Sequence, residues 1–292
     1  MSQMERPEKR ALTGPFLAPD WDLGRLRLHP PGRPLVMGVV NLTPDSFHSP
    51  SRPLGTSAAV ELALGLAEAG ADLLDLGAES SRPGSKPVSA DEELRRLQPV
   101  LKMVRAETDL PITVDTFRAD TASAALDAGA DAINDISAGT ADPAMIGLVA
   151  QRGCGLILMH MQGNPGTMQK DPQYGDVVAE VTDWLAGRCR AAEAAGIARE
   201  RLMIDPGIGF GKTLEHNLAL LGSLDIVAGN RPLLLGASRK SFIGEVTRAA
   251  TADRLPGSLA AVAAAWTGGA TMVRVHDVAE TLQFLEVLKA VG

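Results

Sequence analysis

Polar and charged side chains follow a series of short apolar runs along this chain of 292 residues. The runs end in acids, amides or bases, at Asn41, Asp75 to Glu79, Asp115, Asn134, His160, Asp205, Ser238 to Ser241 and Arg274 to Asp277. Acids and amides suit a neutral heterocycle rich in N–H donors, whereas arginine, lysine and histidine suit a phosphate or carboxylate. These residue types together indicate an enzyme that acts on a phosphorylated, nitrogen-rich small molecule.

One of these segments, residues 203–213, looks at first like a phosphate-binding loop. Its Gly209-Phe210-Gly211-Lys212-Thr213 is similar to the end of a P-loop, but that motif needs a further glycine where Pro206 stands. The dinucleotide-binding fingerprint fails as well, because its third glycine would fall on Lys212. We therefore expect no nucleotide here, and we expect Asp205 to lie at the mouth of a site.

The elements that would position these residues repeat along the chain from Leu35 onward. Apolar runs rich in leucine and β-branched residues predict strands at 36–40, 72–76, 112–114, 132–136, 155–159, 201–204, 233–235 and 272–275. Alanine- and leucine-rich segments with helical period predict helices at 56–68, 90–105, 121–128, 143–151, 177–195, 214–222, 257–266 and 279–291. About eight strand–helix units in ~250 residues predict a single (β/α)8 TIM barrel, in which the carboxyl ends of all strands meet at one face. A doubly wound sheet is the alternative fold, and it would want a glycine fingerprint after the first strand, where none stands.

The chain divides in this interpretation into residues 1–34, an N-terminal extension, and residues 35–292, the barrel. Residues 23–28 alternate apolar and basic side chains, and Pro30-Pro31-Gly32 predicts a turn after them. With the chain from Pro34 onward, these residues predict a hairpin that closes one end of the fold. The composition shows no second-domain boundary.

Composition and charge exclude several classes of function. The net charge of −7 argues against a general nucleic-acid-binding protein. Residues 1–20 lack the apolar core of a signal peptide, and no apolar run is long enough to cross a membrane, so we expect a cytoplasmic protein. Cys154 and Cys189 are expected to be free thiols.

The histidines do not form a metal site by their spacing. No pair has the spacing of a zinc-binding helix, so a catalytic zinc is not expected. His160 is interpreted as a packed histidine at the rim of the barrel, and His216 as part of a helix face.

The motifs at the strand ends resemble, in order, those of the dihydropteroate synthase family. The first block runs from Met37 to Phe47 and the second from Glu79 to Gly84. The remaining blocks are Asp115-Thr116, Asn134 to Ile136, Met159 to Met161, Asp205 to Lys212, Ser238 to Gly244 and Arg274 to Asp277. The resemblance runs from about Leu35 to the C-terminus, and eight ordered blocks are far more specific than any one of them.

This resemblance implies a (β/α)8 barrel and a reaction of folate biosynthesis. The enzyme would join p-aminobenzoate to 6-hydroxymethyl-7,8-dihydropterin diphosphate, by a dissociative route, to give 7,8-dihydropteroate and pyrophosphate. Sulfonamides would compete for the aminobenzoate site. The family also implies a homodimer, with the apolar late helices (259–265 and 284–288) as candidate surfaces, and small molecules as the only other partners.

The resemblance assigns roles to individual residues. The pterin-binding residues would be Asp115, Asn134, Met159, Asp205 and Lys240. The diphosphate would be held by Asn41, Ser81, Arg82, Arg274 and His276. The aminobenzoate would be held by Phe47, Pro83, Phe210 and Ser241. Asn41 would also be a ligand of a Mg²⁺ cofactor, which diphosphate oxygens and water complete. Asp115, Lys240, Arg274 and His276 would be the catalytic residues.

The chain departs from the family pattern in its first loop, where His48-Ser49-Pro50-Ser51 replaces Ser-Asp-Gly-Gly. Two other functions stay open beside the synthase. One is the methyltetrahydrofolate-binding domain of corrinoid methyltransferases, which would not need Arg82, Arg274 and His276. The other is a non-catalytic pterin-binding relative, in which Asp115, Asp205 or Lys240 would be expected to be lost.

Overall fold

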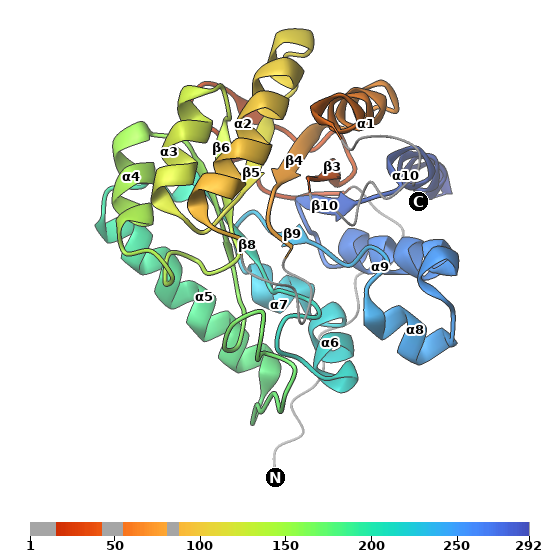
Figure 1. Ribbon diagram of the computed structural model, residues 1–292. Coiled ribbons are helices and arrows are strands. Elements are labelled where there is room, and N and C mark those ends of the chain that lie inside the picture. Colours follow the sequence, from red (N-terminus) through yellow and green to blue (C-terminus); the bar gives the residue numbers. More distant parts are fainter. Residues whose placement is uncertain (1–15, 43–54, 81–87, 292) are drawn as a thin grey trace.

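Eight parallel strands form the centre of the molecule (Figure 1). The computed structural model describes residues 16–42, 55–80 and 88–291. The strands are β3 (Leu35–Asn41), β4 (Leu73–Gly77), β5 (Ile112–Asp115), β6 (Ala132–Asp135), β7 (Gly155–Met159), β8 (Leu202–Asp205), β9 (Leu234–Leu235) and β10 (Met272–Val275). Their order in the sheet is β8-β7-β6-β5-β4-β3-β10-β9. A single parallel bridge between Ile204 and Leu233 joins the two ends of this sheet, so the ring closes into the predicted barrel.

Helices surround this ring (Figure 1). They are α1 (Thr56–Glu68), α2 (Ala90–Glu107), α3 (Ala119–Asp127), α4 (Ala144–Arg152), α5 (Val177–Ala194), α6 (Leu214–Leu221), α7 (Leu224–Ala228), α8 (Ser241–Thr247), α9 (Leu255–Thr267) and α10 (Val278–Val291), with short 3-10 turns at Arg199–Arg201 and Thr251–Asp253. The eight predicted helices are all present. The short helices α7 and α8 were not predicted, because one or two helical turns carry too few apolar positions to show a period.

The strand residues alternate between two separate apolar clusters. Outward-facing side chains such as Leu74, Leu76 and Val114 belong to the large cluster between strands and helices. Inward-facing side chains, among them Met37, Leu73 and the residues that follow, fill one end of the barrel: Leu35, Ala132, Ile157, Met203, Leu234 and Met272. Because the chain supplies few aromatic residues, leucine, methionine and isoleucine fill this space. Most inward positions nearer the carboxyl ends of the strands are polar, with Val39 and Met159 as exceptions.

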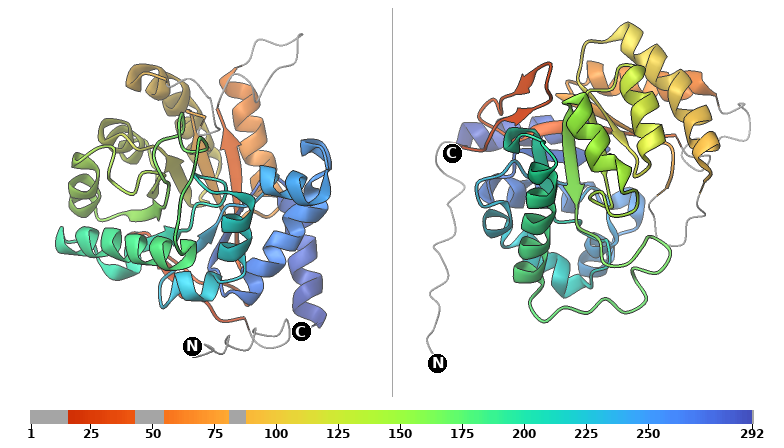
Figure 2. Two further views of the ribbon diagram at one scale, coloured as in Figure 1. Left: turned by 90° about the horizontal axis from the view of Figure 1, so that it is seen from below. Right: turned by 90° about the vertical axis from the view of Figure 1, so that its left-hand side faces the viewer.

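A hairpin covers the apolar end of the barrel. Its strands, β1 (Trp21–Asp22) and β2 (Arg27–Leu28), pair antiparallel, and Trp21 packs against the inner apolar cluster. Trp21 is fully buried, and its Nε1 donates a hydrogen bond to the carbonyl oxygen of Arg201 at 3.0 Å. The predicted hairpin is therefore confirmed; its segment is drawn in red in Figure 2.

The turn of this hairpin differs from the prediction. It lies between Asp22 and Arg27 and not at Pro30-Pro31-Gly32. Gly24 adopts a positive φ of 89° and donates its N–H to Oδ1 of Asp22 at 2.8 Å, which forms a tight turn. The two prolines lack the N–H that a strand partner needs, so the Pro30 segment turns the chain into β3 instead.

No helix in the described ranges is long and apolar enough to cross a lipid bilayer.

Candidate active site at the barrel mouth

A buried acid on β4 organises the polar half of the barrel interior. Asp75 has no solvent exposure, and Nε of Arg274 donates to its Oδ2 at 2.6 Å. Thr113 donates its hydroxyl to Oδ1 at 2.5 Å, and Asn134 donates its amide to Oδ2 at 3.3 Å. A buried carboxylate needs such partners, because an unpaired charge in the interior is strongly destabilising. Asp75 therefore fixes the guanidinium of Arg274 at the polar end of the barrel interior.

The same guanidinium reaches a second acid. Nη2 of Arg274 lies 3.3 Å from Oδ2 of Asp115, the last residue of β5. Burial and the neighbouring charge of Asp75 raise the pKa of Asp115 above the ordinary range, while Arg274 opposes this shift. A carboxylate whose pKa is raised by burial and whose partner is a cation is typical of a functional site.

An acid and a lysine lie on the side of the mouth formed by β8 and the segment after β9. Asp205 ends β8, and its Oδ1 accepts the N–H of Gly207 at 2.7 Å. Burial raises the pKa of Asp205, and the charge of Lys240 opposes the shift. Burial lowers the pKa of Lys240 to about 8, and its ammonium donates to the carbonyl oxygen of Ile208. The ammonium also lies 4.5 Å from the centre of the Phe210 ring.

The other two residues assigned to the pterin lie between these groups. Asn134 stands opposite Asp115 in the pairing of β5 with β6, and Met159 stands opposite Asp205 in the pairing of β7 with β8. Both side chains are buried. The five residues assigned to the pterin therefore lie at the carboxyl ends of β5 to β8 and, for Lys240, in the segment between β9 and α8.

Some of the remaining assigned residues lie within the ranges that the structure describes, and others do not. Asn41 is the half-buried last residue of β3. His276 follows β10, is exposed, and has Nδ1 3.1 Å from the hydroxyl of Ser238. Ser241 is the exposed first residue of α8. Phe47, Ser81, Arg82 and Pro83 lie outside the described residues, as does the altered first loop.

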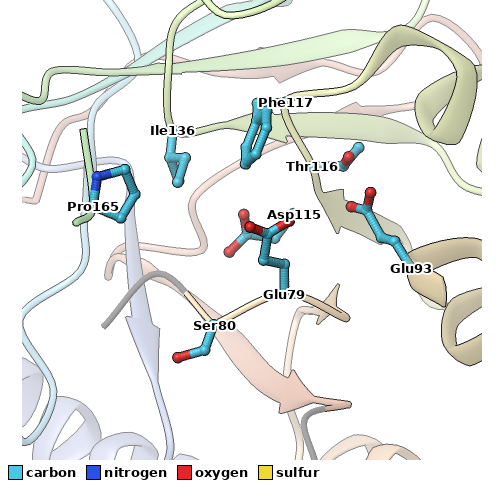
Figure 3. Close-up of a pocket in the computed structure, with 8 residues that line it drawn as sticks. All are labelled: Glu79, Ser80, Glu93, Asp115, Thr116, Phe117, Ile136 and Pro165. Carbon is cyan, nitrogen blue, oxygen red and sulfur yellow. The ribbon is translucent and has the colours of Figure 1, made fainter. Parts of the chain in front are cut away.

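A pocket opens beside Asp115. Its lining includes Glu79, Ser80, Glu93, Asp115, Thr116, Phe117, Ile136 and Pro165. Figure 3 shows acids on one side of this pocket and the side chains of Phe117, Ile136 and Pro165 on the other. The mouth therefore offers both carboxylate acceptors and an apolar wall.

Two residues of this polar network had no role assigned from the sequence. Asp75 was named among the acids at the strand ends, where it interrupts the apolar run Leu73-Leu74-Asp75-Leu76, but no ligand or partner was assigned to it. Arg118 carries no such signal. Its Nη1 donates to Glu79 and to the buried Glu93, both at 2.6 Å, and so ties the segment after β4 and helix α2 to the loop that carries Asp115.

The two histidines near the loop after β8 are structural. His160 is buried and packs edge-on against Trp184, with 4.9 Å between ring centres. Burial lowers the pKa of His160 to about 3, so the ring is neutral. His216 belongs to α6 and forms a reciprocal cap with Thr213. Both agree with the sequence-based interpretation.

The side chains at the mouth can be compared with the ligands that a Mg²⁺ ion prefers. Within residues 16–42, 55–80 and 88–291, no group of three or more histidines, cysteines or acids is arranged to hold a metal ion. Asn41 offers one neutral oxygen at the mouth. This set fits an ion that keeps most of its ligands as water and substrate oxygens, as Mg²⁺ commonly does.

Comparisons with known proteins agree with this geometry. A family model described as pterin binding enzyme matches residues 37–276. The dihydropteroate synthase of Neisseria meningitidis serogroup B is 45% identical over 280 residues, which cover 93% of this chain and 97% of the relative.

Solved structures of dihydropteroate synthases are also similar to this chain. The Xanthomonas albilineans dihydropteroate synthase with 4-aminobenzoic acid has a TM-score of 0.87 at 46% identity and covers 94% of this chain and 98% of its own. The dihydropteroate synthase of the same organism in complex with 7,8-dihydropteroate has a TM-score of 0.84 at 44% identity, with the same coverage. This chain belongs to the dihydropteroate synthase family, the pterin-binding transferases of folate biosynthesis.

Proposed function

We propose that this chain condenses p-aminobenzoate with 6-hydroxymethyl-7,8-dihydropterin diphosphate and releases 7,8-dihydropteroate and pyrophosphate. The observation that carries the proposal is the ionic chain at the mouth, in which Arg274 lies between the buried Asp75 and the partly buried Asp115. Arg274 is a fixed cation that can stabilise the departing diphosphate. Asp115 is a carboxylate of raised pKa that can stabilise the cationic carbon left behind.

The pterin ring lies, in this proposal, between the ends of β5 and β8. Asp115 and Asp205 accept hydrogen bonds from the ring N–H and amino group, and Asn134 contributes its amide. Lys240 moves from the carbonyl of Ile208 to the carbonyl and ring nitrogen of the pterin. The buried thioether of Met159 packs on the ring face. Asp205 is buried and Asp115 is partly buried, so N–H donors of a heterocycle would replace the hydrogen bonds that their oxygens lose with water.

Departure of the diphosphate is the difficult step. Arg274 is held by Asp75, so its guanidinium is already oriented before charge develops on the leaving oxygen. Arg82, His276 and Ser81 contribute further donors. Asn41 would help to hold a Mg²⁺ ion, which when bound would supply Lewis-acid stabilisation of the diphosphate.

The bond to the departing oxygen breaks first in this mechanism, and its electron pair leaves with the pyrophosphate. The pterin methylene left behind is cationic and conjugated with the ring, and the carboxylate of Asp115 stabilises it. The arylamine needs no activation, because its nitrogen is neutral with a free lone pair at neutral pH. Its lone pair forms the new C–N bond, and the extra proton leaves the nitrogen afterwards.

The aminobenzoate lies against Phe210, with Phe47 and Pro83 as further walls and Ser241 near its carboxylate. Ser241 is the first residue of helix α8. We also propose a homodimer, with the late helices as the contact surface. Sedimentation of the purified chain tests the dimer independently of the chemistry.

Heat protection tests whether the aminobenzoate site depends on the bound pterin diphosphate and Mg²⁺. We expect p-aminobenzoate to raise the melting temperature only when a pterin diphosphate analogue and Mg²⁺ are present, because a ligand stabilises a fold only when it binds the folded state at the concentration used. Protection by p-aminobenzoate alone would contradict the proposed site. Protection by methyltetrahydrofolate without any diphosphate would favour the methyltransferase-type barrel instead.

A further inference from the structure

Successive carbonyl groups of the loop after β8 are each held by a different side chain. Lys240 donates to the carbonyl oxygen of Ile208, and Gln169 donates to that of Gly209 at 2.7 Å. Lys212 donates to the carbonyl oxygen of Phe210 at 2.9 Å, and the hydroxyl of Tyr174 donates to that of Gly211 at 2.9 Å. Only Lys240 among these four side chains has an assigned role in the reaction.

The loop needs these partners because its backbone cannot pair with a strand. Gly207, Gly209 and Gly211 adopt positive φ angles of 67°, 80° and 63°, so the carbonyls between them point in changing directions. The loop also lies directly on the segment after β7. A Cβ added to Gly207 would lie 1.9 Å from the carbonyl oxygen of His160, so the two segments touch through their backbones.

Lys212 joins these two segments. It is 3% exposed, and its ammonium reaches three acceptors: the carbonyl of Phe210, Nδ1 of His160 at 3.0 Å and the carbonyl of His160 at 3.4 Å. Three acceptors match the three N–H donors of an ammonium group. The neutral ring of His160 leaves Nδ1 open to accept. Burial lowers the pKa of Lys212 to about 7, and the charge of Asp205 opposes this shift.

The held loop connects two parts of the proposed site. It begins after Asp205, which is assigned to the pterin, and it carries Phe210, which is assigned to the aminobenzoate. The Phe210 ring also lies against the ammonium of Lys240. A shift of the Phe210 carbonyl would therefore move the wall of the second substrate site, whereas Asp205 stays held by its strand and by Gly207.

We propose that Lys212 is a positioning residue of the reaction, which fixes Phe210 for the second substrate by bonding the loop after β8 to the segment after β7. This inference rests on the proposed function. Tyr174 and Gln169, which belong to the same segment after β7, hold the neighbouring carbonyls of the loop.

The test compares Lys212→Met with Lys170→Met. Methionine keeps most of the buried stem of Lys212 but removes all three hydrogen bonds. Lys170 is an exposed lysine of the neighbouring segment and serves as the matched control. We expect Lys212→Met to raise KM for p-aminobenzoate about tenfold and to lower kcat/KM by up to about 10²-fold, the scale of a small misplacement near a reacting group. The dissociation constant of the pterin diphosphate should change less than about twofold on the same ground, and Lys170→Met should match the wild type.

A second variant covers the case in which Lys212→Met does not fold. Tyr174→Phe removes only the hydroxyl that holds Gly211, and it should shift the same KM in the same direction by a smaller factor. If these residues had a purely structural role, the substitutions would lower the melting temperature and leave the KM for p-aminobenzoate unchanged. That outcome in both variants would overturn the proposal.

Hydrogen exchange separates this inference from the proposed function. The N–H of Phe210 donates to the carbonyl of Gly207 at 3.0 Å, and its exchange reports the order of the loop. If the wild type released no pyrophosphate, the proposed function would fail, and faster exchange at Phe210 in Lys212→Met would still support the anchoring role. Unchanged exchange in a folded Lys212→Met protein would overturn it.

Discussion

The two ends of the barrel interior differ in almost every physical respect. The end under the hairpin is apolar, closed by Trp21 and filled by side chains such as Met37 and Ile157. The opposite end holds buried and partly buried charges, among them Asp75, Asp115 and Lys240. Burial of apolar surface stabilises a fold, whereas buried charges contribute little net stability and persist where they serve a function. The comparison separates the residues that hold the barrel together from those that would carry out chemistry.

The largest expected effect is on stability at the apolar end. Trp21→Ala removes a fully buried side chain and its hydrogen bond to Arg201, so the free energy of unfolding should fall by about 3–5 kcal/mol. Denaturant unfolding measures this loss. The turnover number of the folded protein should be unchanged, and a large fall in turnover would contradict the separation of the two ends.

The next effect is on catalysis at the polar end. Arg274→Ala should lower kcat by ~10²-fold or more, because it removes the oriented cation that stabilises the leaving group. Steady-state kinetics measures this change. The substitution also leaves Asp75 unpaired, so a double variant with Asp75→Asn provides the control.

The double variant should regain stability, because Asp75→Asn removes the unpaired buried charge. It should not regain activity, because the guanidinium of Arg274 is still absent. Near-normal turnover in Arg274→Ala would contradict the assigned role. Recovery of turnover in the double variant would mean that the single substitution acted only through misfolding.

A smaller effect is expected in the dependence of stability on pH. The pKa of Asp115 is raised in the folded protein, so this carboxyl binds a proton more tightly in the folded than in the unfolded state. Its contribution to stability is therefore full below the unfolded pKa of about 3.9 and is lost as pH rises through the raised folded value. Asp115→Asn should remove this part of the decline, which unfolding measurements between acidic and neutral pH would detect.

The dependence of activity on pH should also reflect the titration of Asp115. If ionised Asp115 stabilises the cationic pterin carbon, kcat/KM should fall on acidification at a pH above the ordinary range for a carboxyl group. Asp115→Asn should lower the rate by ~10²-fold and abolish this limb of the profile. An unchanged limb in the variant would assign it to another group.

The smallest expected effect is at the protein surface. Arg95 pairs with Glu92 on the outside of α2, with Nε 2.7 Å from Oε2, and its side chain is largely exposed. Arg95→Met should change neither unfolding nor kinetics measurably, because exposed ion pairs are screened by solvent. A marked kinetic effect would mean that the outer helical layer couples to the mouth.

Much of the fold followed from periodicity. The alternation of apolar strands with amphipathic helices from β3 onward predicted the barrel, and elements such as Thr56–Glu68 and Gly155–Met159 have their predicted bounds. The hairpin turn was misplaced because Pro30-Pro31-Gly32 is the stronger local turn signal, while the actual turn depends on Gly24 and on pairing with Trp21. The domain division at residue 34 stays a prediction.

The candidate site was predictable where a motif carried it and not where only three-dimensional contact does. Asp115, Asp205 and Lys240 stand in recognisable blocks at strand ends, and the structure brings their segments together. Arg118 and Lys212 act through partners distant in sequence, such as Glu79 and His160, and periodicity cannot reveal such pairs. Mg²⁺, the homodimer and the cytoplasmic location stay predictions.

Release of pyrophosphate tests the central claim, that the polar end of the barrel couples the two substrates. The purified protein would be given pterin diphosphate and Mg²⁺, with and without p-aminobenzoate, and pyrophosphate would be measured over time. We predict release that requires both substrates and that a sulfonamide blocks. Tight binding of the pterin with no release in the presence of p-aminobenzoate would contradict the account and would favour a non-catalytic pterin-binding protein.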